Sequence, residues 1–115
     1  MKLHEWNRVP KEQLSELLAR QVIHGENLTV ARIYLAKGAV VPRHSHENEQ
    51  ITVLIEGRLR FVFDDESKSV VPGQVMEIPP HAAHRVEALE DSLAMDLFAP
   101  RREDWIRGDD AYLRR

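Results

Sequence analysis

The chain has 115 residues, of which 43% are hydrophobic and 30% charged, and it contains six histidines but no cysteine. This length suits one domain spanning residues 1–115, and the lack of cysteine excludes disulfides, thiolate nucleophiles and sulfur-bound metals. With 16 basic and 19 acidic residues the formal net charge is -3, which argues against a nucleic-acid partner. No apolar run reaches the length of a membrane span or a signal peptide, so we expect a cytoplasmic protein with no membrane partner.

The elements predicted along the chain are short and mostly extended. Leu14, Leu17 and Leu18 follow Pro10 at helical spacing, which predicts a short N-terminal helix over residues 10–18. Turn residues then recur about every 8 to 12 positions, as in a β-barrel or sandwich. The segments between the turns predict eight strands, at residues 19–24, 28–37, 51–56, 58–63, 69–71, 74–78, 84–89 and 92–99. The amphipathic tail predicts a short C-terminal helix or two, so we expect an all-β jelly roll with short helical ends.

A pair of histidines near the middle of the chain is the first candidate site. His44 and His46 lie two residues apart, so an extended backbone directs both imidazoles to one side. Gln50 has the same parity, whereas Glu49 belongs to the opposite face, and Gln50 is therefore the expected partner. Taken alone, such a pair is more often two exposed loop histidines. Imidazole nitrogens with an amide oxygen suit a divalent transition metal: Fe, Mn, Ni, Zn or Cu.

An acidic residue in the last predicted strand is the second candidate. Ala94, Asp96 and Phe98 share one strand face, and a carboxylate on a half-buried face needs a partner. One interpretation is an acid–base group in a pocket beside the metal. The other is a structural ion pair with one of three arginines: Arg58, Arg60 or Arg85.

Two arginines follow that strand directly. Arg101 and Arg102 offer the planar fork of donors that matches a carboxylate, so either residue could hold an acidic substrate at the rim of the barrel. The alternative is solvated charge that caps the tail helix together with Glu103 and Asp104.

The wider spacing resembles the two sequence motifs of the cupin superfamily. The first motif matches at Gly38, His44, His46 and Gly57, and the second at Gly73, Pro79 and His84. The chain departs from the usual pattern at Gln50, where glutamate is common, at His81, where glycine is common, and at Ala88, where asparagine is common. The resemblance implies a jelly-roll β-barrel that holds one divalent metal ion on His44, His46, Gln50 and His84. Such a neutral ligand set leaves the full charge on the ion and favours an anionic substrate.

Residues 20–105 also resemble a narrower group, the small single-domain cupins of pectin and alginate breakdown that open the ring of 4,5-unsaturated monouronates. The residues that carry this resemblance are 44–50, 81–89 and, above all, 96–105. The resemblance implies catalytic roles for Asp96 and Arg102, and substrate binding by Phe98 and Arg102.

We therefore expect a metal-dependent enzyme that converts a small anionic sugar acid into its linear keto acid, with Asp96 moving the proton. The alternatives are an Fe(II) dioxygenase or sugar isomerase on the same barrel, and a non-catalytic cupin that binds a small acid. We also expect a homodimer formed through the second apolar face of the last strand, with Leu93, Met95 and Leu97. We expect His81 to lie near the pocket mouth, and His4 and His24 to lie on the surface.

Overall fold

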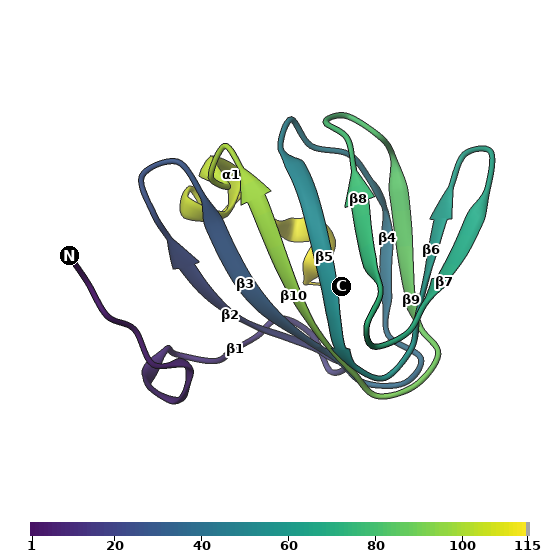
Figure 1. The fold of residues 1–115 in the computed structure, drawn as a ribbon, viewed down its shortest axis with the longest axis horizontal. Helices are drawn as coiled ribbons and strands as arrows, with labels where there is room; N and C mark the ends of the chain where they lie inside the picture. The colour runs from purple at the N-terminus through teal and green to yellow at the C-terminus, as the bar shows by residue number, and fades with distance from the viewer. Residues whose placement is uncertain (115) are drawn as a thin grey trace.

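The computed structural model describes residues 1–114, and β-strands form nearly all of its regular structure (Figure 1). The strands are β1 (Glu12–Gln13), β2 (Leu18–His24), β3 (Thr29–Leu35), β4 (Val40–His44), β5 (Glu49–Glu56), β6 (Leu59–Phe63), β7 (Ser67–Val70), β8 (Val75–Ile78), β9 (His84–Ala88) and β10 (Ser92–Ala99). The helical segments are η1 (Trp6–Arg8), α1 (Glu103–Ile106) and η2 (Ala111–Leu113). The prediction of a mostly β protein is therefore confirmed.

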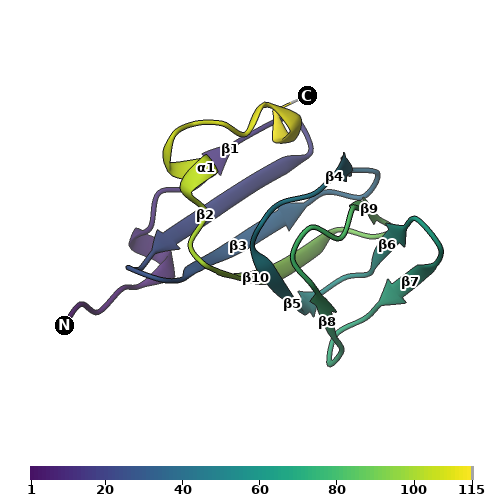
Figure 2. The same cartoon turned by 90° about the horizontal axis from the view of Figure 1, so that it is seen from above.

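The strands form two antiparallel sheets on either side of the core (Figure 2). The larger sheet has the order β1-β2-β3-β10-β5-β8, and the smaller has the order β4-β9-β6-β7. Within the described residues there are ten strands, not the eight predicted. The two additions are β1, a two-residue strand that pairs with β2, and β4, which ends at His44 and pairs with β9.

Alternation along β5, and along β10 beyond the register shift at Leu93 and Ala94, decides which side chains reach the interior. In β5, Gln50, Thr52 and Leu54 are buried, whereas Ile51 and Ile55 are exposed. In β10, Ala94 and Phe98 are buried and Leu97 is exposed. The two strands are neighbours, with Asp96 directly opposite Thr52. The parity predicted for Gln50 and Asp96 is thus the one that the sheet adopts.

His44 and His46 do not share a strand with Gln50, so the prediction of one extended segment for the three residues is wrong. β4 ends at His44 and β5 begins at Glu49, so His46 lies in the connecting loop and not on one strand shared with Gln50. The two strands belong to different sheets. The loop therefore joins the two walls of the molecule, and it is this crossing that brings His44 and His46 to face Gln50.

The helix predicted for residues 10–18 is not present. The backbone N–H groups of Leu14 and Ser15 both donate to the carbonyl of Leu18, at 2.9 and 3.1 Å, which closes a tight turn between β1 and β2. Leu14 and Leu18 are buried, but Leu17 is exposed. The leucines therefore do not form a single apolar face, and pairing of β1 with β2 replaces the expected helix.

The tail confirms the expected short C-terminal helical segments, α1 and η2. Trp105 and Leu113 are its buried apolar side chains, and η2 packs against β4. Seen from above, the tail lies beside β2 on the side of the molecule where β4 ends (Figure 2). It therefore covers the side on which the two sheets stand apart.

Among the described residues, no helix has both the length and the apolar character needed to cross a membrane.

Candidate metal centre and substrate pocket

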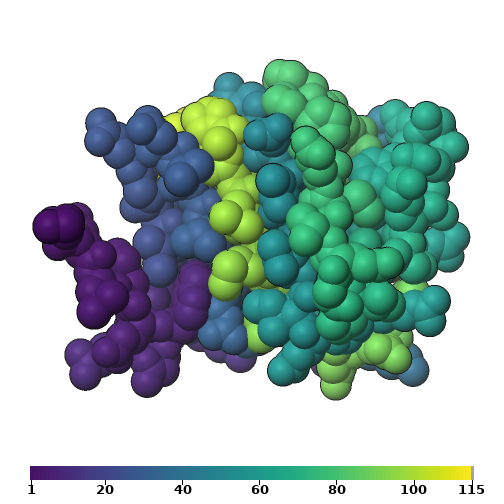
Figure 3. All heavy atoms as spheres, in the orientation of Figure 1, coloured from purple at the N-terminus to yellow at the C-terminus, as the bar shows by residue number. Residues whose placement is uncertain are grey.

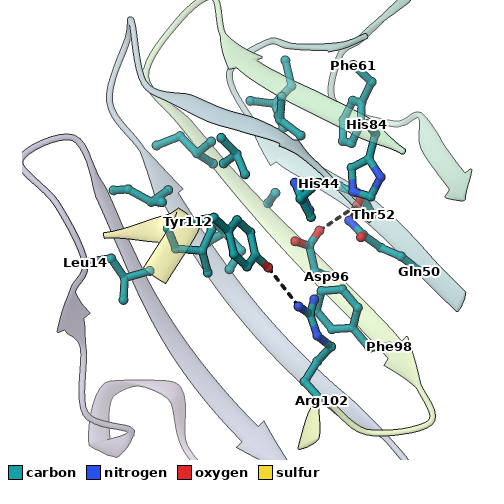
Figure 4. A pocket seen from close by; sticks show the side chains of 18 of the residues that line it. Leu14, His44, Gln50, Thr52, Phe61, His84, Asp96, Phe98, Arg102 and Tyr112 are labelled. Carbon is teal, nitrogen blue, oxygen red and sulfur yellow. Dashed lines mark hydrogen bonds between the residues drawn. The ribbon is translucent and has the colours of Figure 1, made fainter. Parts of the chain in front are cut away.

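A cavity between the two sheets collects polar side chains from both of them and from the tail (Figure 4). Its empty space, including the part open to solvent, is about 550 Å³. The polar residues that line it are His44, Gln50, Thr52, His84, Asp96, Arg102 and Tyr112. The remaining lining is largely apolar, so the few polar groups determine what the pocket can bind.

Three histidines meet at one end of this cavity. His44 at the end of β4 is paired in register with His84 at the start of β9, and His46 approaches from the loop after β4. One ligand nitrogen from each of the three lies within 4.8 Å of the others. The predicted trio is therefore assembled in one place, although its members come from two strands and a loop.

A hydrogen bond at the Nδ1 atom of each ring determines which ring nitrogen is left unprotonated. The Nδ1 atoms of His44, His46 and His84 lie 2.8, 3.0 and 2.8 Å from the backbone carbonyls of Pro42, Asn48 and Ala82. A carbonyl oxygen can only accept, so each neutral ring carries its proton on Nδ1 and has an unprotonated Nε2. Histidines that bind metal through Nε2 commonly donate their Nδ1 proton to a carbonyl in this way.

The environment also keeps these rings neutral. Burial lowers the pKa of His44 to about 3, with the neighbouring His84 adding to the effect. Burial and the charge of Arg102 lower the pKa of His46 to about 4. The pKa of His84 is lowered as well, mainly by burial. At neutral pH all three side chains therefore have a lone pair available for a cation.

Gln50 completes the group through a chain of hydrogen bonds. Its Nε2 donates to the hydroxyl of Thr52 over 2.9 Å, and that hydroxyl donates to Asp96 over 2.7 Å. The Gln50 Oε1 atom consequently faces His46 Nε2 at 3.0 Å. Because the His46 proton is on Nδ1, both facing atoms are acceptors with no proton between them, and a shared cation would remove their repulsion. The chemistry of this donor set fits a divalent transition metal.

Asp96 lies on the inner face of β10 and lines the cavity. The structural ion pair considered for it is not formed: Arg60 and Arg85 both lie near Glu87 instead, at 3.9 and 3.0 Å. Burial raises the pKa of Asp96 to about 6, against the lowering effects of the Thr52 hydrogen bond and of Arg102. Such a carboxyl can exchange a proton near neutral pH.

Arg102 lines the same cavity, whereas Arg101 does not. The Arg101 Nε atom bonds Glu103 over 2.7 Å on the exposed side of the tail, as the solvated alternative predicted for that position. The Arg102 residue is only 1% exposed. Its Nε and Nη2 donate to the two carboxylate oxygens of Asp104, at 3.0 and 2.8 Å. One edge of the Arg102 fork is therefore already filled by Asp104, a partner that the alternative interpretation named, although Arg102 is buried and not solvated.

Phe98 is buried beside these groups and gives the pocket a rigid wall. Its ring packs edge-on against His46 and Trp105, with centroids 5.7 and 5.2 Å apart. The guanidinium of Arg102 lies over the Phe98 and Trp105 rings, 4.6 and 4.3 Å from their centroids. These contacts hold Arg102 in place by cation–π attraction.

The remaining histidines lie on the surface. His4, His24 and His81 are exposed, and none of them lines the cavity. The His81 backbone N–H donates to the carbonyl of His46 over 2.8 Å, so this residue supports the loop that carries a metal-site histidine.

One polar residue of the lining was not predicted from the sequence. Tyr112 comes from the tail, and its ring stacks on His44 with a centroid separation of 4.6 Å. Its hydroxyl accepts a hydrogen bond from Arg102 Nη2 over 2.9 Å. The only signal for it was an aromatic residue in an amphipathic tail, which is equally typical of a packing residue.

Comparison with known proteins identifies the family. The family model of the cupin domain matches residues 31–99, so the chain belongs to the cupin family. No curated protein sequence matches the chain, but solved structures do. It is similar to KdgF from Halomonas sp., with 30% identity and a TM-score of 0.80 over 86% of this chain and 94% of that one.

Other cupins share the fold at lower identity. An RmlC-like cupin from Shewanella frigidimarina has a TM-score of 0.85 and 25% identity, with 91% of this chain and 96% of that one covered. Oxalate decarboxylase from Bacillus subtilis has a TM-score of 0.76 and 20% identity over 84% of this chain and 29% of the longer enzyme. The predicted cupin fold is confirmed, and so is the resemblance to uronate ring-opening cupins, through the match to KdgF.

Proposed function

We propose that this cupin opens the ring of 4,5-unsaturated monouronates to give linear keto acids. The observation that carries the proposal is the position of Asp96, a half-buried carboxyl whose pKa is raised to about 6, in one pocket with Arg102 and with two members of the histidine group, His44 and His84. The similarity to KdgF, a uronate ring-opening cupin, over most of both chains supports it.

His44, His46, His84 and Gln50 would hold one divalent metal ion, with Zn, Ni, Mn and Fe as the candidates. When bound, the ion supplies a Lewis acid that polarises substrate oxygens and stabilises negative charge. All four ligands are neutral, so the positive charge of the site would remain uncompensated and favour an acidic substrate.

The reaction is an isomerisation, and its balance needs only a proton shift. Opening the ring breaks the bond between the anomeric carbon and the ring oxygen as the anomeric hydroxyl loses its proton. The released enolate becomes a ketone when the neighbouring carbon gains a proton. Asp96 would accept the first proton and return it to carbon, so that no oxidant is consumed. A carboxyl with a pKa near neutral is suited to both directions.

The other pocket residues would bind and orient the sugar acid. Arg102 supplies a fixed positive charge for the substrate carboxylate. Phe98 and its packing partner Trp105 provide an apolar wall that limits how the ring can lie.

The test is to incubate the metal-loaded protein with unsaturated galacturonate and unsaturated guluronate while recording double-bond absorbance and dissolved oxygen. We expect the absorbance to fall faster than in a protein-free sample, with no oxygen uptake. Oxygen consumption coupled to substrate loss would instead identify a dioxygenase. Thermal stabilisation by the acids without any loss of absorbance would identify a binding protein.

We also propose that the protein is a homodimer formed through the outer face of the larger sheet (Figure 3). β5 and β10 lie in the middle of this face. Of the three residues expected there, Leu97 is exposed, Met95 is half-buried and Leu93 is buried. The exposed Ile51 and Ile55 of β5 extend the apolar surface. An apolar face of this kind is typical of an interface. Light scattering in solution is expected to give the mass of two chains, and a monomer would contradict this proposal.

A further inference from the structure

We propose that Tyr112 is a substrate-binding residue, and that its hydroxyl and Arg102 Nη1 together hold the substrate carboxylate. The inference rests on the proposed function for the identity of the acid. Two side chains of the protein, those of Asp104 and Tyr112, already accept hydrogen bonds from the Arg102 guanidinium.

A guanidinium can grip a carboxylate along either of two edges, and here neither edge is wholly free. Asp104 fills the edge formed by Nε and Nη2. The second hydrogen of Nη2, on the edge shared with Nη1, goes to the Tyr112 hydroxyl over 2.9 Å. The Tyr112 oxygen therefore sits where one oxygen of a fork-bound carboxylate would sit. Arg102 cannot offer a substrate the two parallel bonds that the sequence predicted.

One donor on each partner remains for a ligand. Within residues 1–114, the side-chain hydrogen bonds of Arg102 use Nε and Nη2, which leaves Nη1. The Tyr112 oxygen accepts from Arg102 and, over 3.5 Å, from Trp105 Nε1. A hydroxyl that accepts twice still has its own proton to donate. Because the Tyr112 oxygen lies on the edge that Nη2 shares with Nη1, we infer that these two donors bind the two oxygens of one carboxylate.

The tail holds Tyr112 firmly enough for this role. The preceding Asp110 is 1% exposed and accepts hydrogen bonds from Arg20 Nη2 at 2.5 Å and from Arg114 Nε at 3.0 Å. The following Leu113 is buried. Stacking on His44 fixes the ring itself, and Figure 4 shows the hydroxyl directed at Arg102 on the cavity wall. The carboxylate site is thus preorganised before a substrate arrives.

The decisive test is a comparison of acid and ester ligands with the Tyr112→Phe variant. Phenylalanine keeps the ring and its stacking on His44 but removes the hydroxyl. We would measure the affinities of galacturonate and of its uncharged methyl ester by calorimetry. The expected result is a roughly 10-fold loss of affinity for the acid, as for one lost hydrogen bond to a charged group, with little change for the ester. If Tyr112 only positioned Arg102, the ratio of the acid affinity to the ester affinity would change by much less than 10-fold.

The chain offers a matched control in its other tyrosine. The Tyr34 hydroxyl donates to Gln21 Oε1 over 2.5 Å and Tyr34 does not line the cavity, so Tyr34→Phe should keep the wild-type ratio. Equal losses for acid and ester in Tyr112→Phe, no loss at all, or a wild type that does not prefer the acid would overturn the inference. If wild type prefers the acid through Tyr112 but does not turn over unsaturated uronates, the proposed function fails and this inference stands.

Discussion

The Asp96→Asn variant is expected to keep its fold and its metal but to lose turnover of unsaturated uronates by a factor of about 100 to 10,000. This is the usual contribution of a general acid–base residue. The asparagine side chain can accept a hydrogen bond from the Thr52 hydroxyl, as the carboxylate does, but it cannot take a proton from the substrate. The measurement is the initial rate of absorbance loss at saturating substrate. The exposed Asp65, replaced by asparagine, is the matched control and should keep full activity.

The stability of the same variant distinguishes a catalytic defect from misfolding. Burial raises the pKa of Asp96 from about 3.8 to about 6, so in metal-free protein its ionisation opposes folding. This cost is absent below about pH 4, grows as the pH rises, and reaches about 3 kcal/mol above pH 6. Metal-free Asp96→Asn should therefore melt at a higher temperature than wild type at pH 7.5, and the difference should vanish near pH 4. An active variant, or an inactive one that is less stable than wild type at pH 7.5, would contradict the assigned role.

Loss of one histidine ligand is the second large effect that we expect. His46→Ala removes a ligand nitrogen from the loop after β4 without disturbing a strand, and should weaken metal affinity by more than about 100-fold. Replacement of groups that only support a metal ligand already costs about 10- to 100-fold. Elemental analysis of purified protein should find about one divalent ion per wild-type chain and almost none in the variant.

A surface histidine provides the control for this experiment. His4 is exposed and lies outside the histidine group, so His4→Ala should retain the metal. Circular dichroism of both variants checks the fold. Unchanged metal content in His46→Ala would exclude the proposed ligand set.

The parts of the site that lie within single strands could be predicted from the sequence. Alternation grouped Gln50 with the histidines and Asp96 with Ala94 and Phe98, because a strand has only two faces. The spacing of the histidines indicated the metal group through resemblance to cupins. That reasoning placed His44 and His46 on one strand with Gln50, and the loop between the two sheets was not foreseen.

The parts that depend on contacts between distant segments could not be predicted. Leucine spacing near Leu14 indicated a helix, but pairing of β1 with β2 prevailed there, since tertiary context overrides a weak local preference. The Tyr112 bond to Arg102 depends on how the tail folds back over the pocket. Motif spacing contains no information about that fold, so the two-donor carboxylate site emerged only from the structure.

The most direct test of the central claim is to remove the metal with a chelator, add a divalent ion back stepwise, and record turnover of unsaturated uronate at each step. The account predicts almost no activity without metal and a rise that ends at one equivalent per chain in wild type, with no comparable rise in His46→Ala. Full activity in the chelated protein would contradict it.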